Sequence, residues 1–226
     1  KAERNKFLVR LTKFGAENGV RITILSGDVH LCCMSRLYTN GKRVKQGEIP
    51  KTAAEDPRFI VNLVSSAIVN TPPPNGMAIM LEKRSKLHTF DSFTKEDVVP
   101  LFNHKVQDPE RGNELFFNSR NFSDLILIKN LKDDQKKYFQ DFKEGDLIKA
   151  GPISKLEVVP PKDDECNCDS TPEANNAYPL HPDSLLTSLH VEIDRESVSS
   201  ETQQFQMLIP ELNGKFKLEH VGDKHW

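Results

Sequence analysis

One apolar run limits the folds open to this chain more than any other feature. Residues 59–69 read FIVNLVSSAIV and are followed by NTPPP at residues 70–74. Proline lacks a backbone N–H and has a fixed φ angle, so three in succession end a strand or a helix. The run is too short to cross a bilayer as a helix. It therefore predicts a buried strand over residues 59–69, and the sequence after the prolines predicts a helix over residues 75–87.

Helical and extended patterns alternate along the rest of the chain. Phe7, Leu8, Leu11 and Phe14 recur at helical spacing, which predicts an amphipathic helix over residues 2–18 with these side chains on its buried face. Alternating or continuous apolar runs predict strands, and the last two are expected to form a hairpin. These strands are expected at residues 20–25, 31–38, 125–128, 185–193 and 205–209. The succession indicates an α/β (α+β) fold.

Charge and cysteine content restrict the classes of binding partner and the cellular location expected for this chain. The 226 residues carry a net charge of -2, so the chain lacks the basic excess that nucleic-acid binding needs. No apolar run is long enough for a transmembrane segment, while peripheral association with a membrane stays open. The four cysteines form two close pairs that do not make a disulfide framework. An intracellular, cytoplasmic location is expected on this basis.

The segment ITILSGDVHL contains the strongest candidate for chemistry. An apolar strand ends at Gly27, and Asp28 and His30 follow at positions i and i+2. In an extended segment these two side chains point to the same side. A carboxylate and an imidazole are good ligands for Mn, Fe or Zn. The alternative interpretation is structural: Asp28 caps the turn, and His30 forms a hydrogen bond nearby.

Four segments in the same order carry a resemblance to a known family. They read FGAENGVRITILSGDVH, LCCMSRLY, FIVNLVSSAIVNTPPP and RNFSDL. Together they resemble the carboxy-terminal part of PhoD-like metallophosphatases of the eukaryotic branch, within the metallophosphoesterase superfamily. The resemblance implies the carboxy-terminal half of a two-sheet sandwich flanked by helices, followed by an irregular extension that ends in a strand pair. It covers residues 1 to about 125 and is weaker beyond them.

The resemblance also implies an activity and its site. The intact protein is expected to be a metal-dependent phosphatase that hydrolyses a phosphate ester with two divalent or trivalent cations, such as Fe, Mn, Zn or Ca. Asp28 and His30 then correspond to the last metal-binding motif and are the expected metal ligands and catalytic residues. Gly27 and Asn70 are expected to shape the site. No dinucleotide-binding or phosphate-binding glycine loop is present.

A two-metal centre needs more ligands than this motif supplies. The earlier motifs of the family are not found here, and three weaker matches are interpreted as turns or irregular segments: Asn103-His104, Gly145-Asp146 and residues 222–225. We therefore expect a fragment whose partner is the missing amino-terminal part of the same protein. This chain alone is expected to be inactive.

Two domains are expected, with a boundary near residue 130. Residues 1–130 would be the carboxy-terminal part of the phosphatase domain, and residues 131–226 an extension with an acidic, proline-rich mobile loop at 160–183. The alternative function is a non-catalytic scaffold or partner-binding module on the same fold. Upstream sequence with aspartate-bearing strand ends would favour the enzyme.

Overall fold

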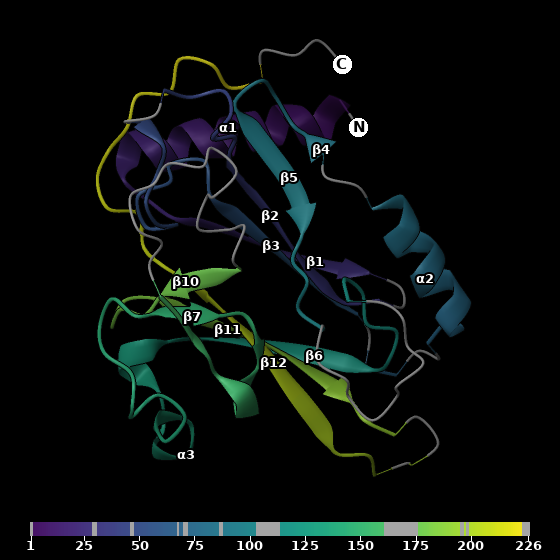
Figure 1. Cartoon of the computed structure of the whole chain (residues 1–226). Coiled ribbons are helices and arrows are strands. Elements are labelled where there is room, and N and C mark those ends of the chain that lie inside the picture. Colours follow the sequence, from purple (N-terminus) through teal and green to yellow (C-terminus); the bar gives the residue numbers. More distant parts are fainter. Residues whose placement is uncertain are drawn as a thin grey trace.

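Figure 1 shows the fold of the whole chain as a computed structural model. The structure describes residues 2–28, 31–45, 48–66, 68–69, 72–85, 88–102, 114–160, 176–194, 197 and 199–222.

Helices are few and strands are many in these residues. The helices are α1 (Ala2–Asn18), α2 (Asn75–Arg84) and α3 (Asp133–Lys136), with short 3-10 turns at Ile128–Asn130 and Ile153–Lys155. The first six strands are β1 (Ile22–Asp28), β2 (Cys33–Thr39), β3 (Ile60–Ser66), β4 (His88–Thr89), β5 (Thr94–Val98) and β6 (Asn121–Leu127). The remaining strands are β7 (Leu147–Lys149), β8 (Gly151–Pro152), β9 (Val158–Val159), β10 (Ala177–Pro179), β11 (Leu185–Glu192) and β12 (Thr202–Ile209).

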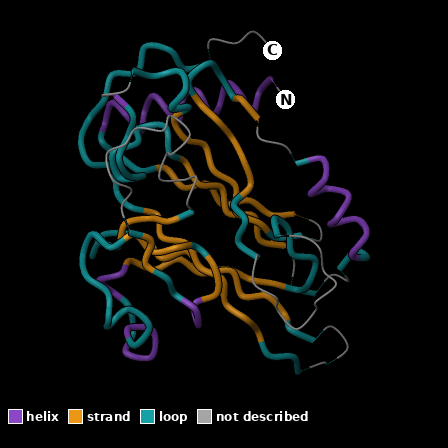
Figure 2. The backbone as a smooth tube through the Cα atoms, in the orientation of Figure 1, coloured by secondary structure: helices purple, strands orange, loops and turns teal. Residues whose placement is uncertain are grey.

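The strands form three sheets. A five-stranded sheet has the order β1-β3-β2-β5-β4, a four-stranded sheet has the order β6-β11-β12-β8, and a three-stranded sheet has the order β10-β7-β9. In Figures 1 and 2 the five-stranded sheet lies in the upper half of the molecule near α1, and the other two sheets lie below it. The fold is therefore mixed α/β, as expected. The specific likeness to a metallophosphoesterase sandwich stays a prediction.

The hydrophobic core lies between the sheets. One cluster takes side chains from all three, including Met34 and Leu63 of the five-stranded sheet, Leu189 and Phe205 of the four-stranded sheet, and Ile148 of β7. Because these residues come from both sides of position 130, the extension is packed on the first part of the chain. The boundary predicted at residue 130 stays a prediction, although the core is continuous across it.

Helix α1 covers the other face of the five-stranded sheet. Leu8 packs with Leu37 and Ile60 there, with Leu11 beside them. The expectation that Phe7 and Phe14 would share this buried face is wrong, because both side chains are more than half exposed. The helix instead turns its small residues toward the sheet. A Cβ atom on Gly15 would lie 2.7 Å from the carbonyl oxygen of Val20, in the connection to β1, and 3.1 Å from the side chain of Ile22 in β1, so there is no space for a larger side chain.

Several strands lie where no strand was predicted from the sequence, and β5 and β10 are the most informative of them. Strand β5 has the charged sequence TKEDV and pairs antiparallel with β2. Strand β10 lies within residues 160–183, which were expected to form a mobile loop, yet Tyr178 is completely buried. That expectation is wrong for residues 177–179, because β10 pairs with β7. Residues 161–175 lie outside the described part of the chain.

The end of the chain returns to the five-stranded sheet. We call residues 210–222 the carboxy-terminal strap. Its backbone N–H groups donate to the carbonyls of Ala54 and Ala16, from Asn213 and Phe216 respectively, each at 2.8 Å. The predicted hairpin before it is confirmed, since β11 and β12 pair antiparallel from Leu185 opposite Ile209 onward.

Candidate metal centre

The candidate site lies where two parallel strands end. β1 and β3 run parallel in a register that places Gly27 opposite Ser65 and Asp28 opposite Ser66. The carboxyl ends of parallel strands meet at one edge of a sheet, and ligand sites of α/β proteins gather at such edges. Asp28 is exposed there. The sequence-based prediction of Asp28 at a strand end is confirmed.

The carboxylate of Asp28 has a structural role in the turn that follows. Its Oδ1 accepts a hydrogen bond of 3.0 Å from the backbone N–H of Leu31. This contact is the capping that the structural interpretation predicts. Because a carboxylate has about four acceptor positions, capping one N–H is compatible with binding a cation as well.

Of the other three predicted site residues, the structure describes only Gly27. His30 and Asn70 lie outside the described residues. At Gly27, an added Cβ atom would meet as its nearest described neighbour the carbonyl oxygen of Ser65, at 4.0 Å. Packing among the described residues therefore does not require glycine here. A ligand that approaches the backbone would require it.

Sequence reasoning missed the polar side chains beneath this edge. The hydroxyl of Ser26 donates to Oδ1 of Asn62 at 2.8 Å, and the hydroxyl of Ser65 donates to Oδ1 of Asn121 at 3.0 Å. Asn121 is almost completely buried at the start of β6. These amides orient the strand ends that carry the site. The segment RNFSDL, which contains Asn121, was the one available signal.

Two buried cysteines lie next to the site in sequence. Cys32 and Cys33 are both buried. Burial, together with the smaller effect of the negative charge of Asp28, raises the pKa of the Cys33 thiol to about 12. The thiolate is the form that binds metals, and Cys33 is a neutral thiol near pH 7. Cys166 and Cys168 lie outside the described residues.

A second group of possible ligands lies near the strap. Ligand atoms of His181, Asp183 and Glu211 all lie within 4.8 Å of one another. Nε2 of His181 also lies 2.8 Å from Glu144. Lys129 forms an ion pair with Asp183, and its hydrogen bond lowers the pKa of that carboxyl. A cation is thus already paired with this group of acids. The residues lie far apart in sequence and formed no motif.

The turn predicted at Gly145-Asp146 is confirmed. Gly145 has φ +92, and Oδ2 of Asp146 accepts the backbone N–H of Lys143 at 2.7 Å. The carboxylate therefore closes a local turn before β7. Asn103-His104 and residues 223–225 lie outside the described part of the chain.

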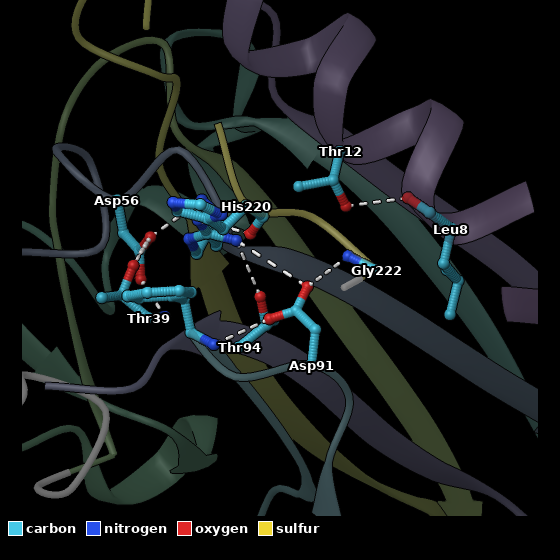
Figure 3. A network of polar contacts seen from close by, with 10 residues as sticks. Leu8, Thr12, Thr39, Asp56, Asp91, Thr94, His220 and Gly222 are labelled. Carbon is cyan, nitrogen blue, oxygen red and sulfur yellow. Dashed lines mark hydrogen bonds and ion pairs between the residues drawn. The ribbon is translucent and has the colours of Figure 1, made fainter. Parts of the chain in front are cut away.

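A cavity of about 590 Å³ lies beside the strap, where Arg58 and Phe93 meet His220. Figure 3 shows the polar network at its wall, with Asp91 between Thr94 and Gly222. Arg58 donates to the hydroxyl of Thr94 and to the carbonyl of His220, each at 3.0 Å. Because Arg58 and Asp91 form hydrogen bonds with the backbone of His220 and Gly222, the network holds the strap in place.

The chain is similar in sequence to a known family and to a yeast protein. The sequence model of a family described as "PhoD related phosphatase" matches residues 1–157. The uncharacterized protein YGR266W of Saccharomyces cerevisiae is 37% identical over 238 residues, a match that covers 100% of this chain and 33% of the yeast protein. The chain thus spans about a third of the length of this curated relative. No solved structure matches. Among the described residues, no helix has the length and apolar character needed to cross a membrane.

Proposed function

Because the chain belongs to the PhoD-related phosphatase family, we propose that the intact protein hydrolyses phosphate esters with the help of two bound metal ions. In this proposal Asp28 and His30 are metal ligands, and the remaining ligands come from other parts of the full-length protein. The single observation that carries the proposal is the exposed carboxylate of Asp28 at the common end of two parallel strands.

The residues at this edge fit a hard or borderline cation. Carboxylate oxygen and imidazole nitrogen are the donors that Mn, Fe and Zn take, and Asp28 supplies the first of these from an exposed position. Gly27 leaves room at the backbone. When bound, such cations polarise a phosphoryl group and make water more acidic. Capping by Leu31 N–H holds the Asp28 carboxylate in one orientation, which favours ligation over free rotation.

The test compares matched variants of the full-length protein. Asp28→Asn and His30→Ala are expected to lower both bound metal and phosphatase turnover, the latter by at least about a hundred-fold. Asp183→Asn, which removes a carboxylate from the second group, is expected to leave both unchanged. Unchanged metal content and turnover in the Asp28 and His30 variants would contradict the proposal.

The control variant also separates the two candidate metal groups. If Asp183→Asn removed the metal while Asp28→Asn kept it, the centre would lie at His181, Asp183 and Glu211 instead. A full-length protein that binds no metal and turns over no phosphate ester would leave the non-catalytic scaffold as the better interpretation.

A further inference from the structure

The five-stranded sheet extends one strand beyond the sheet that faces it. β1 is its edge strand and is paired with β3 alone among the described strands. β6 is the edge strand of the four-stranded sheet, and Asn121 of β6 meets Ser65 of β3 through the 3.0 Å hydrogen bond. The layer between the sheets therefore stops at β3. β1 lies outside it.

Leu25 shows that this arrangement leaves a core face uncovered. Leu25 lies opposite Leu63 in the β1–β3 register, so the two side chains project from the same face of the sheet. Leu63 is 1% exposed within the core, whereas Leu25 is 63% exposed. A leucine on the core face of a sheet is normally covered.

Helix α1 and β1 have the arrangement of the helix and second strand of a β-α-β unit. Parallel strands are joined by crossovers of a dozen or more residues, usually a helix packed on the sheet. α1 has 17 residues, packs against Leu37 and Ile60 of the sheet, and reaches β1 through residues 19–21. A strand before α1 would complete a β-α-β unit, and its place would be the edge of β1 with which no described strand pairs.

We propose that a strand of the same full-length polypeptide, preceding α1, pairs parallel with the outer edge of β1 and covers Leu25. The length of the yeast relative supports this occupant, since this chain accounts for 33% of it. The added strand would end at the same sheet edge as Asp28. The inference goes beyond the proposed function, because it concerns assembly and holds whether or not the protein turns over phosphate esters.

Solvent labelling of two side chains tests the proposal. Hydroxyl-radical footprinting is applied to this chain alone and to the full-length protein, with Val158 of β9 as the control because it is also a substantially exposed aliphatic side chain. Oxidation of Leu25 is expected to fall about ten-fold or more in the full-length protein, and amide exchange in β1 to slow similarly. Val158 is expected to label equally in both.

A substitution provides a second and independent measurement. Leu25→Asp is expected to lower the melting temperature of the full-length protein and leave that of this chain unchanged, because only the former covers the side chain. Val158→Asp is the matched control. Equal labelling of Leu25 in the two proteins would overturn the proposal. So would protection of Leu25 in this chain alone through self-association, which would assign the edge to a second copy. Neither outcome depends on phosphatase activity.

Discussion

The guanidinium of Arg36 and the phenol of Tyr178, 142 positions apart in the chain, are joined by a hydrogen bond of 2.6 Å. Arg36 also binds both oxygens of Asp97, at 2.7 and 3.2 Å. Its side chain is almost completely buried. A residue of β2 thus holds β5 in its own sheet and β10 in another, so the first part of the chain and the extension share one charged network.

Removing this arginine is expected to be costly. Arg36→Ala would leave the carboxylate of Asp97 without its buried partner, which destabilises by about 3–5 kcal/mol. Arg4→Ala is the matched control, because Arg4 is half exposed in its ion pair with Glu96 and its loss should cost at most about 1 kcal/mol. Urea unfolding of both variants measures the difference. Equal losses would show that the buried network contributes no more than a surface pair.

Alkaline pH is expected to reveal the buried thiol of Cys33. Its pKa rises from 9.0 to about 12 on folding, so the unfolded chain releases the proton first. The contribution of this group to the free energy of unfolding is complete below pH 9 and is lost as the pH rises toward 12, by about 1.4 kcal/mol per pH unit. Urea unfolding between about pH 8 and about pH 11 should show a steeper decline for the native chain than for Cys33→Ala. Parallel declines would argue against the burial of this thiol.

Two substitutions of Asp28 separate its structural role from its chemical one. In Asp28→Asn the amide oxygen can still accept the Leu31 N–H, so the stability of this chain should change little, while the loss of charge should weaken metal binding by the full-length protein. Asp28→Ala also removes the cap and should cost about 1 kcal/mol of stability. Thermal unfolding and metal analysis check the two effects. If Asp28→Asn bound metal normally, capping would be the main role of the carboxylate.

Gly222 is expected to tolerate no side chain. Its φ is +73, and a Cβ atom there would lie 2.4 Å from Cγ2 of Val9. Gly222→Ala should therefore destabilise the chain by about 1–3 kcal/mol through backbone strain and displacement of the strap. In α2, Gly76 has nothing within 4 Å of its Cβ position, and Gly76→Ala should stabilise by up to about 1 kcal/mol. Melting temperatures shifting in the same direction would contradict the described packing of the strap.

This chain alone is expected to show no phosphatase activity with Mn, Fe or Ca. A two-metal centre takes ligands from several segments, and the chain spans about a third of its curated relative. The assay needs the full-length protein as its positive control and an intact unfolding transition of the chain as evidence of folding. Robust turnover by the chain would mean that its own residues complete the centre.

Strong local patterns predicted the elements around the candidate site. Residues 60–66 of the apolar run predicted as a strand over 59–69 form β3, and the strand predicted before Asp28 is β1, because each has a continuous or alternating apolar sequence. Strand β5 was missed because its charges resemble a surface loop. They are neutralised at long range, Glu96 by Arg4 and Asp97 by Arg36. Such partners cannot be found from spacing along the sequence.

At the candidate site, too, the residues that sequence alone did not predict are those brought together by long-range contacts. Asp28 could be predicted because a glycine and a strand end mark it locally. Asn121 and the group formed by His181, Asp183 and Glu211 come together only through sheet pairing and the return of the chain after β12. The buried face of α1 was also decided by tertiary packing. Its small residues Gly15 and Ala16 are buried, whereas Phe7 and Phe14 are exposed.

The carboxy-terminal strap has a consequence for biosynthesis. Val9 of α1 is synthesised before every strand described here and Gly222 after all of them, so the contact between the two residues can form only once residue 222 has left the ribosome. A product terminated before residue 210 would keep all its strands. It would nevertheless hold the buried Asp91 carboxylate without the hydrogen bond that Gly222 N–H donates to it. Asp91 would keep the Phe93 N–H and the Arg58 guanidinium as partners, so such a truncation would weaken, at one buried acid, the structure that the strap completes.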